Sequence, residues 1–272
     1  MVSEKKVLEA NRKKWAALVP VHLKSRYYSV DKFKAGKSSL SNLDLAEVGK
    51  VRGKSLLHLQ CHFGMDTLSW ARLGALVTGV DFSLEAIRAA QALSRELGIP
   101  ARFVCADIYD LPRRLKGDYD IVYTSHGVLC WLPDLARWGR VVAKYLRPGG
   151  AFHLIESHPF TQLLDSEGSR PALNTNRRYF NDGRPTHYKD DFTYADGKIP
   201  RPMDVYVWPF SLSGVINALT AAGLRVEYVR EFPFCDWGFS SWVSKSRDGN
   251  WYPRGNDIEL PLTFSLRATK PS

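Results

Sequence analysis

Short apolar runs and amphipathic segments alternate along the middle of the chain. Five apolar runs of strand length predict buried strands: 55–60, 76–80, 101–106, 119–124 and 151–155. The segments between some of them carry apolar residues at helical spacing: 66–73, 83–98 and 135–146. Strands that alternate with helices in this order are typical of a parallel α/β sheet.

The rest of the chain surrounds this pattern. Residues 1–50 form an N-terminal arm that we expect to be helical, and 51–272 form one domain. Within that domain, 160–207 is rich in Asn, Asp, Gly, Pro and Tyr and shows no clear helical or strand period. Connections this long are often lids or binding insertions, so we expect 160–207 to cap a site. A helix at 212–222 and strands at 224–231 and 260–268 complete the predicted elements, with an aromatic loop at 232–252.

Composition narrows the class of protein. The chain is 44% hydrophobic and 24% charged, which argues against disorder. Its longest apolar runs are far shorter than a membrane span, and the first residues have no apolar signal region. Four cysteines without a CxxC pair argue against a zinc ribbon or a disulfide framework. These features predict a cytoplasmic protein with reduced thiols.

The net charge of +10 is concentrated in the arm. Residues 1–54 hold thirteen basic and five acidic side chains, a balance of +8, so the remainder is close to neutral. A solvated basic segment is the favoured interpretation, and an RNA-binding face is the alternative. No RNA-recognition signature accompanies the charge, which argues against nucleic acid as a partner.

Polar residues follow each predicted strand. The segments concerned are Gln60-Cys61-His62-Phe63-Gly64, Asp81-Phe82-Ser83, Asp107-Ile108, Ser125-His126-Gly127 and Glu156-Ser157-His158. Ligands of open parallel sheets bind beyond the carboxyl ends of the strands, where these residues should meet. The sequence therefore predicts a ligand crevice at this edge of the sheet.

Two carboxylates in this set favour a nucleoside. Asp81 can accept hydrogen bonds from ribose hydroxyls, and Asp107 can accept one from an adenine amino group. Either residue alone would equally suit a helix cap or a loop-ordering role. Their placement on consecutive strand ends, beside a loop containing Gly64, favours the nucleoside.

The loop after the first strand narrows the choice of cofactor. A dinucleotide needs G-x-G-x-x-G here, so that the backbone approaches the pyrophosphate. The loop reads Q-C-H-F-G instead, and large side chains at 60 and 62 would crowd a diphosphate. The P-loop pattern is also missing. S-adenosylmethionine (SAM) carries adenosine without phosphate and fits these residues.

Five segments, in order and at normal separations, resemble the motifs of class I SAM-dependent methyltransferases. They are 56–64 (LLHLQCHFG), 79–83 (GVDFS), 106–108 (ADI), 119–122 (YDIV) and 146–150 (LRPGG). The resemblance implies a seven-stranded, mostly parallel sheet with helices on both faces and the last strand antiparallel. The first motif departs from [DE]-x-G-x-G-x-G, because His58 replaces the acidic residue and Gln60 and His62 replace two glycines.

The resemblance also implies the cofactor and its site. The cofactor is SAM and the product S-adenosylhomocysteine (SAH), with Asp81 on the ribose and Phe82 and Asp107 at the adenine. The residues expected to bind it are Tyr28, Gln60, Cys61, His62, Gly64, Asp81, Phe82, Asp107, Ile108 and Ser125. Ordinary packing of the arm is an equal alternative for Tyr27 and Tyr28.

Methyl transfer needs an acceptor placed in line with the departing sulfur, and sometimes a base. His126, Glu156 and His158 follow the fourth and fifth strands and are the candidates for that base. Hydrogen-bonded structural histidines and a loop-capping glutamate are the alternatives. His58 and His62 have a spacing seen in metal sites, but a strand end is the wrong place for it, and we predict no metal.

Aromatic residues outside the sheet are expected to form the substrate pocket. They are Tyr27, Trp131, Tyr179, Trp208, Phe234 and Trp237. A second hydrophobic core beneath long loops is an equal alternative for several of them.

These features predict methyl transfer to a nitrogen or oxygen of a small aromatic or heterocyclic molecule, for instance in secondary metabolism. A methyltransferase acting on RNA or protein and a non-catalytic SAM-binding protein are the alternatives. Ser125-His126-Gly127-Val128 stands where many nucleobase N-methyltransferases carry [DNS]-P-P-[FYW], which disfavours a nucleobase acceptor. We expect a monomer or homodimer without a membrane partner.

Overall fold

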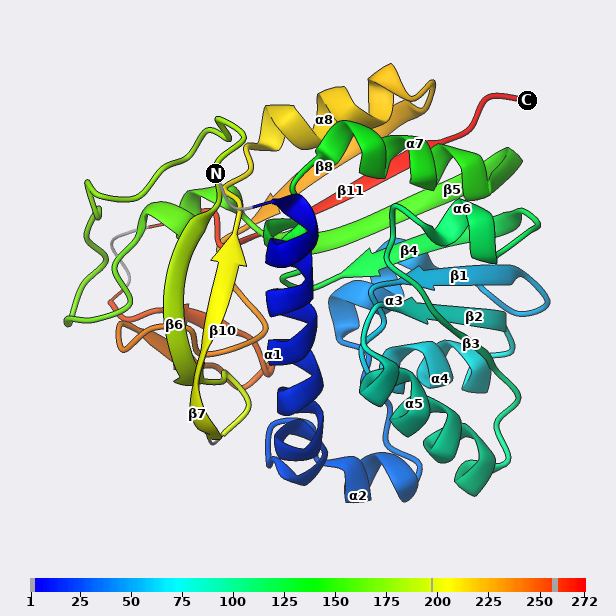
Figure 1. The fold of residues 1–272 in the computed structure, drawn as a ribbon, viewed down its shortest axis with the longest axis horizontal. Coiled ribbons are helices and arrows are strands. Elements are labelled where there is room, and N and C mark those ends of the chain that lie inside the picture. The colour runs from blue at the N-terminus through cyan, green and yellow to red at the C-terminus, as the bar shows by residue number, and fades with distance from the viewer. Residues whose placement is uncertain (1–2, 197, 256–258) are drawn as a thin grey trace.

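A seven-stranded sheet lies at the centre of the computed structural model, which describes residues 3–196, 198–255 and 259–272 (Figure 1). Its strands are β1 (Ser55–Leu59), β2 (Leu76–Asp81), β3 (Arg102–Cys105), β4 (Tyr119–Ser125), β5 (Leu146–Ser157), β8 (Arg225–Phe232) and β11 (Thr263–Thr269). They are arranged in the order β3-β2-β1-β4-β5-β11-β8. Only β11 runs antiparallel to its neighbours, which confirms the predicted fold class.

Helices cover both faces of this sheet because side chains of consecutive strand residues point to opposite sides. Leu57 and Leu59 of β1 belong to the core beneath α6 (Leu111–Arg114), α7 (Leu135–Tyr145) and α8 (Leu212–Ala221). Leu56 belongs to the core on the other face, beneath α3 (Asn42–Val48) and α4 (Met65–Arg72). Helix α5 (Leu84–Leu97) packs beside α4 and is capped by Ser83, whose side chain accepts from the Ala86 N–H.

The insertion contains a β-hairpin that the sequence pattern did not predict. Its strands are β6 (Thr186–Phe192) and β7 (Lys198–Val207), which pair antiparallel. All β6 side chains are exposed or only partly buried, so no alternation of apolar and polar residues marks the strand. The expectation of an irregular insertion was therefore wrong for these two segments.

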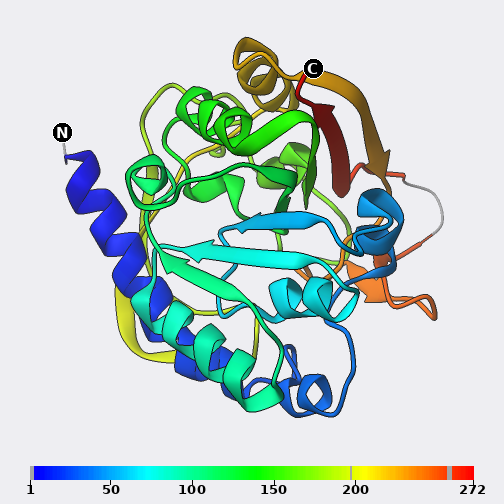
Figure 2. The ribbon, with the colours of Figure 1, turned by 90° about the vertical axis from the view of Figure 1, so that its right-hand side faces the viewer.

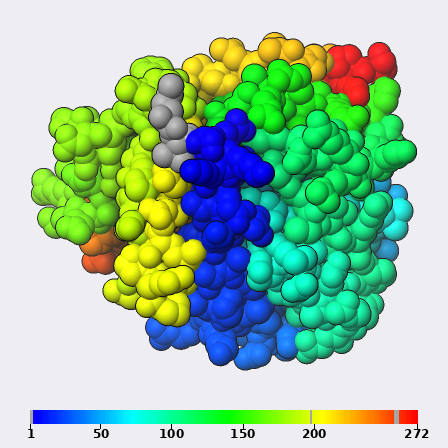
Figure 3. All heavy atoms as spheres, viewed as in Figure 1, coloured from blue at the N-terminus to red at the C-terminus, as the bar shows by residue number. Residues whose placement is uncertain are grey.

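The N-terminal arm is helical, with α1 (Glu4–Lys24) and α2 (Val30–Lys34), and α1 lies between the hairpin and α5 (Figures 1, 2 and 3). The Asn11 side chain exchanges two hydrogen bonds with the Tyr206 backbone of β7. Lys14 donates to the carbonyl oxygens of Asp190 and Phe192 in β6. Because Lys14 is only 3% exposed, the interpretation of a solvated basic arm is wrong at this position.

The aromatic loop forms a small core of its own. It contains the short strands β9 (Val243–Lys245) and β10 (Trp251–Pro253). Outside this loop, the chain forms two 3₁₀ turns, Leu129–Trp131 and Pro159–Leu163. Trp242 is fully buried there with Leu164, Cys235 and Leu262. Within the described ranges, no helix combines the length and apolar character that crossing a bilayer requires.

Candidate functional site

A cavity of about 1160 Å³ opens at the carboxyl ends of the parallel strands. Its floor consists of the loops that follow β1, β2, β3 and β4, and its walls include α1, the β6–β7 hairpin and the loop around Trp237. Parallel strands place their carboxyl ends along one edge, which is why residues far apart in sequence meet here. The crevice predicted from the sequence is therefore present as an open space.

All ten residues predicted to bind the cofactor line this cavity. Asp81 ends β2, and its two carboxylate oxygens each accept one backbone hydrogen bond, from His62 N and Ser83 N, both at 2.9 Å. Burial raises the pKa of Asp81 to about 6, against the effect of these donors. Each oxygen keeps a lone pair for a further donor, so the side chain can both order the first loop and bind a ligand hydroxyl.

Asp107 lines the cavity together with Phe82 and the buried Ile108. One oxygen of Asp107 accepts from Tyr109 N at 2.8 Å, and burial raises its pKa. Two apolar side chains beside a carboxylate provide what a flat base with an exocyclic amino group requires.

The loop after β1 takes a tight path without the usual glycines. Gln60 and His62 have φ of 58° and 49°, in the left-handed region. Gly64 follows with φ 80°, and a Cβ there would lie 2.7 Å from the Phe103 ring. Strain of this kind persists only where the surrounding contacts hold it, and it is common at ligand sites.

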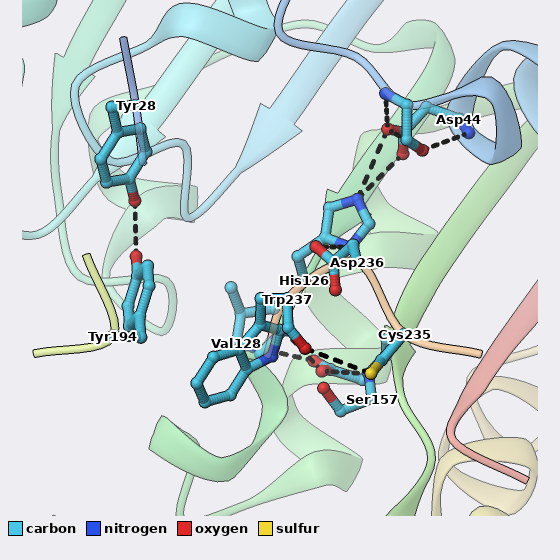
Figure 4. Close-up of polar contacts among 12 residues, drawn as sticks. Tyr28, Asp44, His126, Val128, Ser157, Tyr194, Cys235, Asp236 and Trp237 are labelled. Atoms are coloured by element: carbon cyan, nitrogen blue, oxygen red, sulfur yellow. Dashed lines mark hydrogen bonds and ion pairs between the residues drawn. The ribbon is translucent and has the colours of Figure 1, made fainter. Parts of the chain in front are cut away.

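A chain of side chains closes the cavity over this loop. His62 Nε2 lies 2.8 Å from His22 Nδ1 in α1, and His22 Nε2 lies 2.6 Å from Thr193 Oγ1 in the insertion. The hydroxyl groups of Tyr28 and Tyr194 are hydrogen-bonded beside it (Figure 4). The arm, the first loop and the insertion are thus joined at one point.

The His22–His62 pair makes stability sensitive to acid. Burial lowers the pKa of His22 to about 4, against 6.5 for a free histidine. Between these values the unfolded chain binds more protons than the folded one, so stability falls as the pH drops. Between pH 7 and pH 4 we expect the free energy of unfolding of His22→Gln to fall by up to about 3 kcal/mol less than that of the wild type. Urea unfolding of both proteins at the two pH values measures it, and an equal loss in both would contradict the assignment.

His126 lies between two carboxylates at the end of β4 (Figure 4). Its Nε2 is 3.1 Å from Asp44 Oδ1, and its Nδ1 is 3.2 Å from Asp236 Oδ2. Burial alone would lower the pKa of His126, but Asp236 and Asp44 outweigh it and raise the pKa well above 6.5. The two carboxylates therefore favour the cationic ring, in which Nε2 is hydrogen-bonded to Asp44 and Nδ1 is ion-paired with Asp236.

Glu156, the second candidate base, is 1% exposed at the end of β5. Its carboxylate accepts from four backbone N–H groups, those of Gly127, Val128, Leu129 and Ser157, at 2.6–3.0 Å. Burial raises its pKa, whereas the four donors favour the ionised form. Since four acceptor positions are occupied, the side chain orders the loop after β4, as the capping alternative requires.

The other expected residues divide into two groups. Tyr27, Trp131 and Trp237 line the cavity, whereas His158, Tyr179, Trp208 and Phe234 lie outside its lining. His158 Nε2 faces Glu231 at 2.8 Å, and its Nδ1 accepts from Phe160 N. Trp208 is buried at 3%, and Phe234 packs against Phe232 and Tyr252, as the alternative of a core beneath long loops implies.

Several cavity residues had no signal in the sequence. Among them are Trp15, Asp44, Asp66, Tyr194 and Asp236. They come from the arm, the start of α4, the insertion and the aromatic loop, so only the packing of these segments brings them together. No group of metal-ligating side chains occurs among residues 3–196, 198–255 and 259–272.

The cavity fits an adenosine that carries a cationic tail. Asp81 and Asp107 offer carboxylate acceptors, and Gln60 Oε1 is a buried oxygen without a partner in the described part of the chain. Ribose hydroxyls, an adenine amino group and an ammonium group are the donors these oxygens require. The residues present therefore fit SAM.

Comparison with known proteins agrees with a site for SAM. The model of a methyltransferase domain matches residues 57–154. A ubiquinone biosynthesis O-methyltransferase from Xanthomonas euvesicatoria pv. vesicatoria is 30% identical over 74% of this chain and 75% of its own length. One from Chromobacterium violaceum is 31% identical over 46% of this chain, which spans only 54% of that relative.

The fold recurs among solved structures. A SAM-dependent methyltransferase from Mesorhizobium loti superposes with a TM-score of 0.54, at 23% identity, over 83% of this chain and 94% of its own. At this identity the likeness establishes the architecture alone.

Proposed function

The chain belongs to the class I SAM-dependent methyltransferases, and from this we propose that it methylates an oxygen or nitrogen of a small aromatic molecule. The observation that carries the proposal is the cavity, in which the residues expected to bind adenosine and an aromatic wall share one space. The names of the two relatives favour oxygen as the acceptor atom.

We propose that the ten cavity-lining residues predicted from the sequence hold the cofactor. Asp81 binds the ribose hydroxyls, Asp107 the adenine amino group, and Phe82 and Ile108 pack against the base. The first loop, with Cys61, surrounds the methionine end, and the Ser125 backbone lies beside it. When bound, the cofactor supplies a methyl group already activated by a positively charged sulfur.

The protein contributes placement and exclusion of water. The walls from α1, the hairpin and the Trp237 loop surround an acceptor, and Tyr27, Trp131 and Trp237 supply flat surfaces for it. Holding the reacting atoms about 3 Å apart in line accounts for most of the acceleration in such a displacement. Methyl transfer therefore does not need a base from the protein for every acceptor.

Of the three expected bases, His126 and Glu156 line the cavity. We propose a positioning role for His126. As a cation it holds Asp236 of the aromatic loop and Asp44 of α3 against the end of β4. We propose likewise that Glu156 positions the loop after β4, and that His158, outside the lining, takes no part.

The role of His126 predicts the direction of the pH dependence. If His126 were the base, it would have to lose its proton, so activity would rise with pH. If the cationic ring instead holds Asp44 and Asp236 in place, activity falls when His126 is deprotonated. We expect the ratio of the wild-type rate to the His126→Gln rate to be greatest at neutral pH and to fall in alkaline solution. Rates at saturating substrate between pH 6 and pH 10 measure it. A ratio that rises with pH instead would restore His126 as the base.

The acceptor class is testable with labelled SAM. The protein is incubated with a panel of catechols, phenols and heteroaromatic amines, and the incorporated methyl group is located by mass spectrometry. We expect transfer to at least one oxygen acceptor. Transfer to RNA or protein alone, or SAH binding without transfer to any member of the panel or to a metabolite extract, would contradict the proposal.

A further inference from the structure

The first strand ends without the acidic residue that the first motif of this family carries. His58 occupies that position and is 3% exposed. Its Nδ1 lies 2.9 Å from Thr67 Oγ1, and burial lowers its pKa to about 3, so the ring is neutral. The end of β1 therefore offers no negative charge to a cation in the cavity.

A carboxylate, that of Asp66, lies instead at the other end of the loop that follows β1. Asp66 lies two residues after Gly64, in the first turn of α4, and lines the cavity. One of its oxygens accepts from Ser39 Oγ at 2.6 Å. Burial and the nearby charge of Asp44 raise the pKa of Asp66 to about 6.

Asp66 has no ion-pair partner among the described residues, although the charge of His126 acts on it from a distance. None of the ion pairs formed within the described ranges includes it. Asp66 is only half-buried, but it lies near the carboxylate of Asp44, and two neighbouring negative charges are costly unless a cation compensates them.

A second acceptor lines the same cavity. The Gln60 amide nitrogen donates to Val128 O at 3.1 Å, which fixes the amide, and Oε1 is buried with no hydrogen-bond partner in the part of the chain that the structure describes. An ammonium group has three donors and no acceptor, so a carboxylate and an amide oxygen suit it. Gln60 and Asp66 flank the loop proposed to surround the methionine end.

We propose that Asp66, assisted by Gln60 Oε1, binds the ammonium group at the methionine end of the cofactor. The negative charge missing at position 58 is thereby supplied from the far side of the loop. This assignment rests on the cofactor placement proposed above and adds a residue to it.

Two ligands test the assignment by binding alone. SAH carries the amino-acid end, whereas 5′-methylthioadenosine keeps the adenosine and the sulfur but lacks the ammonium group. Titration calorimetry of wild type and Asp66→Asn is expected to give SAH binding 10- to 100-fold weaker in the variant, from loss of a charged hydrogen bond. Methylthioadenosine binding is expected to stay within twofold.

Two further variants complete the test. Gln60→Asn tolerates the left-handed backbone and withdraws the amide oxygen, so SAH binding should weaken several-fold and methylthioadenosine binding should not. Asp81→Asn should weaken both ligands. Equal losses of both ligands in Asp66→Asn, or no loss of either, would overturn the role of Asp66 while leaving the cofactor site in place. If Asp66→Asn does not fold, the same comparison in Gln60→Asn decides. Wild type that binds neither ligand would overturn the proposed function itself.

Discussion

Replacing Asp81 with alanine is expected to abolish SAH binding, with affinity reduced by at least about 100-fold. The side chain is proposed to accept from two ribose hydroxyls, and charged hydrogen bonds of this kind contribute about 1.5–3 kcal/mol each. The loss also frees His62 N and Ser83 N, which Asp81 now holds, so the first loop relaxes away from the cofactor. Titration calorimetry with SAH measures the effect.

Asp110 provides the matched control. It is an exposed aspartate in the loop after β3, outside the cavity lining, and pairs only weakly with Arg113. Asp110→Ala should bind SAH within twofold of wild type. Normal binding by Asp81→Ala would mean that the cofactor lies elsewhere.

Replacing Glu156 with alanine is expected to lower the free energy of unfolding by about 4 kcal/mol. Four backbone N–H groups lose their acceptor. Each donor that water cannot reach costs about 1–3 kcal/mol, whereas the N–H of the exposed Gly127 can be hydrated. Urea unfolding followed by circular dichroism measures the change. Residues 127–129 also lead directly to Trp131, which lines the cavity. We therefore expect activity to fall together with stability.

The control for this change is an exposed glutamate. Glu96 at the end of α5 pairs with Lys34 at the surface, and Glu96→Ala should change the free energy of unfolding by less than about 1 kcal/mol. A Glu156→Gln variant of wild-type stability but without activity would contradict the structural role and return Glu156 to the role of base.

The sheet was predictable because its signals are local. Each buried strand is a short apolar run, and Ser83 and Gly98 mark the two ends of α5. The meeting of Asp81 and Asp107 at one cavity follows from the parallel order of the strands, which the alternation of strands and helices already indicates.

The rest of the site depends on contacts between distant segments. The charge of His126 is set in part by Asp44, 82 residues earlier, and no local pattern links the two. The β6 strand was missed because its exposed faces give no apolar period, and it is anchored by Lys14 of the arm. Trp208 and Phe234 were expected in the pocket wall because they are aromatic, but they lie outside the cavity lining. Aromatic side chains pack in a hydrophobic core as readily as they bind a ligand.

A crystal structure of the protein grown with saturating SAH is the most direct test of the cofactor site. The account predicts density for the ligand in the cavity, with ribose oxygens within hydrogen-bond distance of Asp81 and the adenine between Phe82 and Ile108. SAH seated at another surface, or a cavity filled by rearranged side chains while the ligand is bound elsewhere, would contradict it.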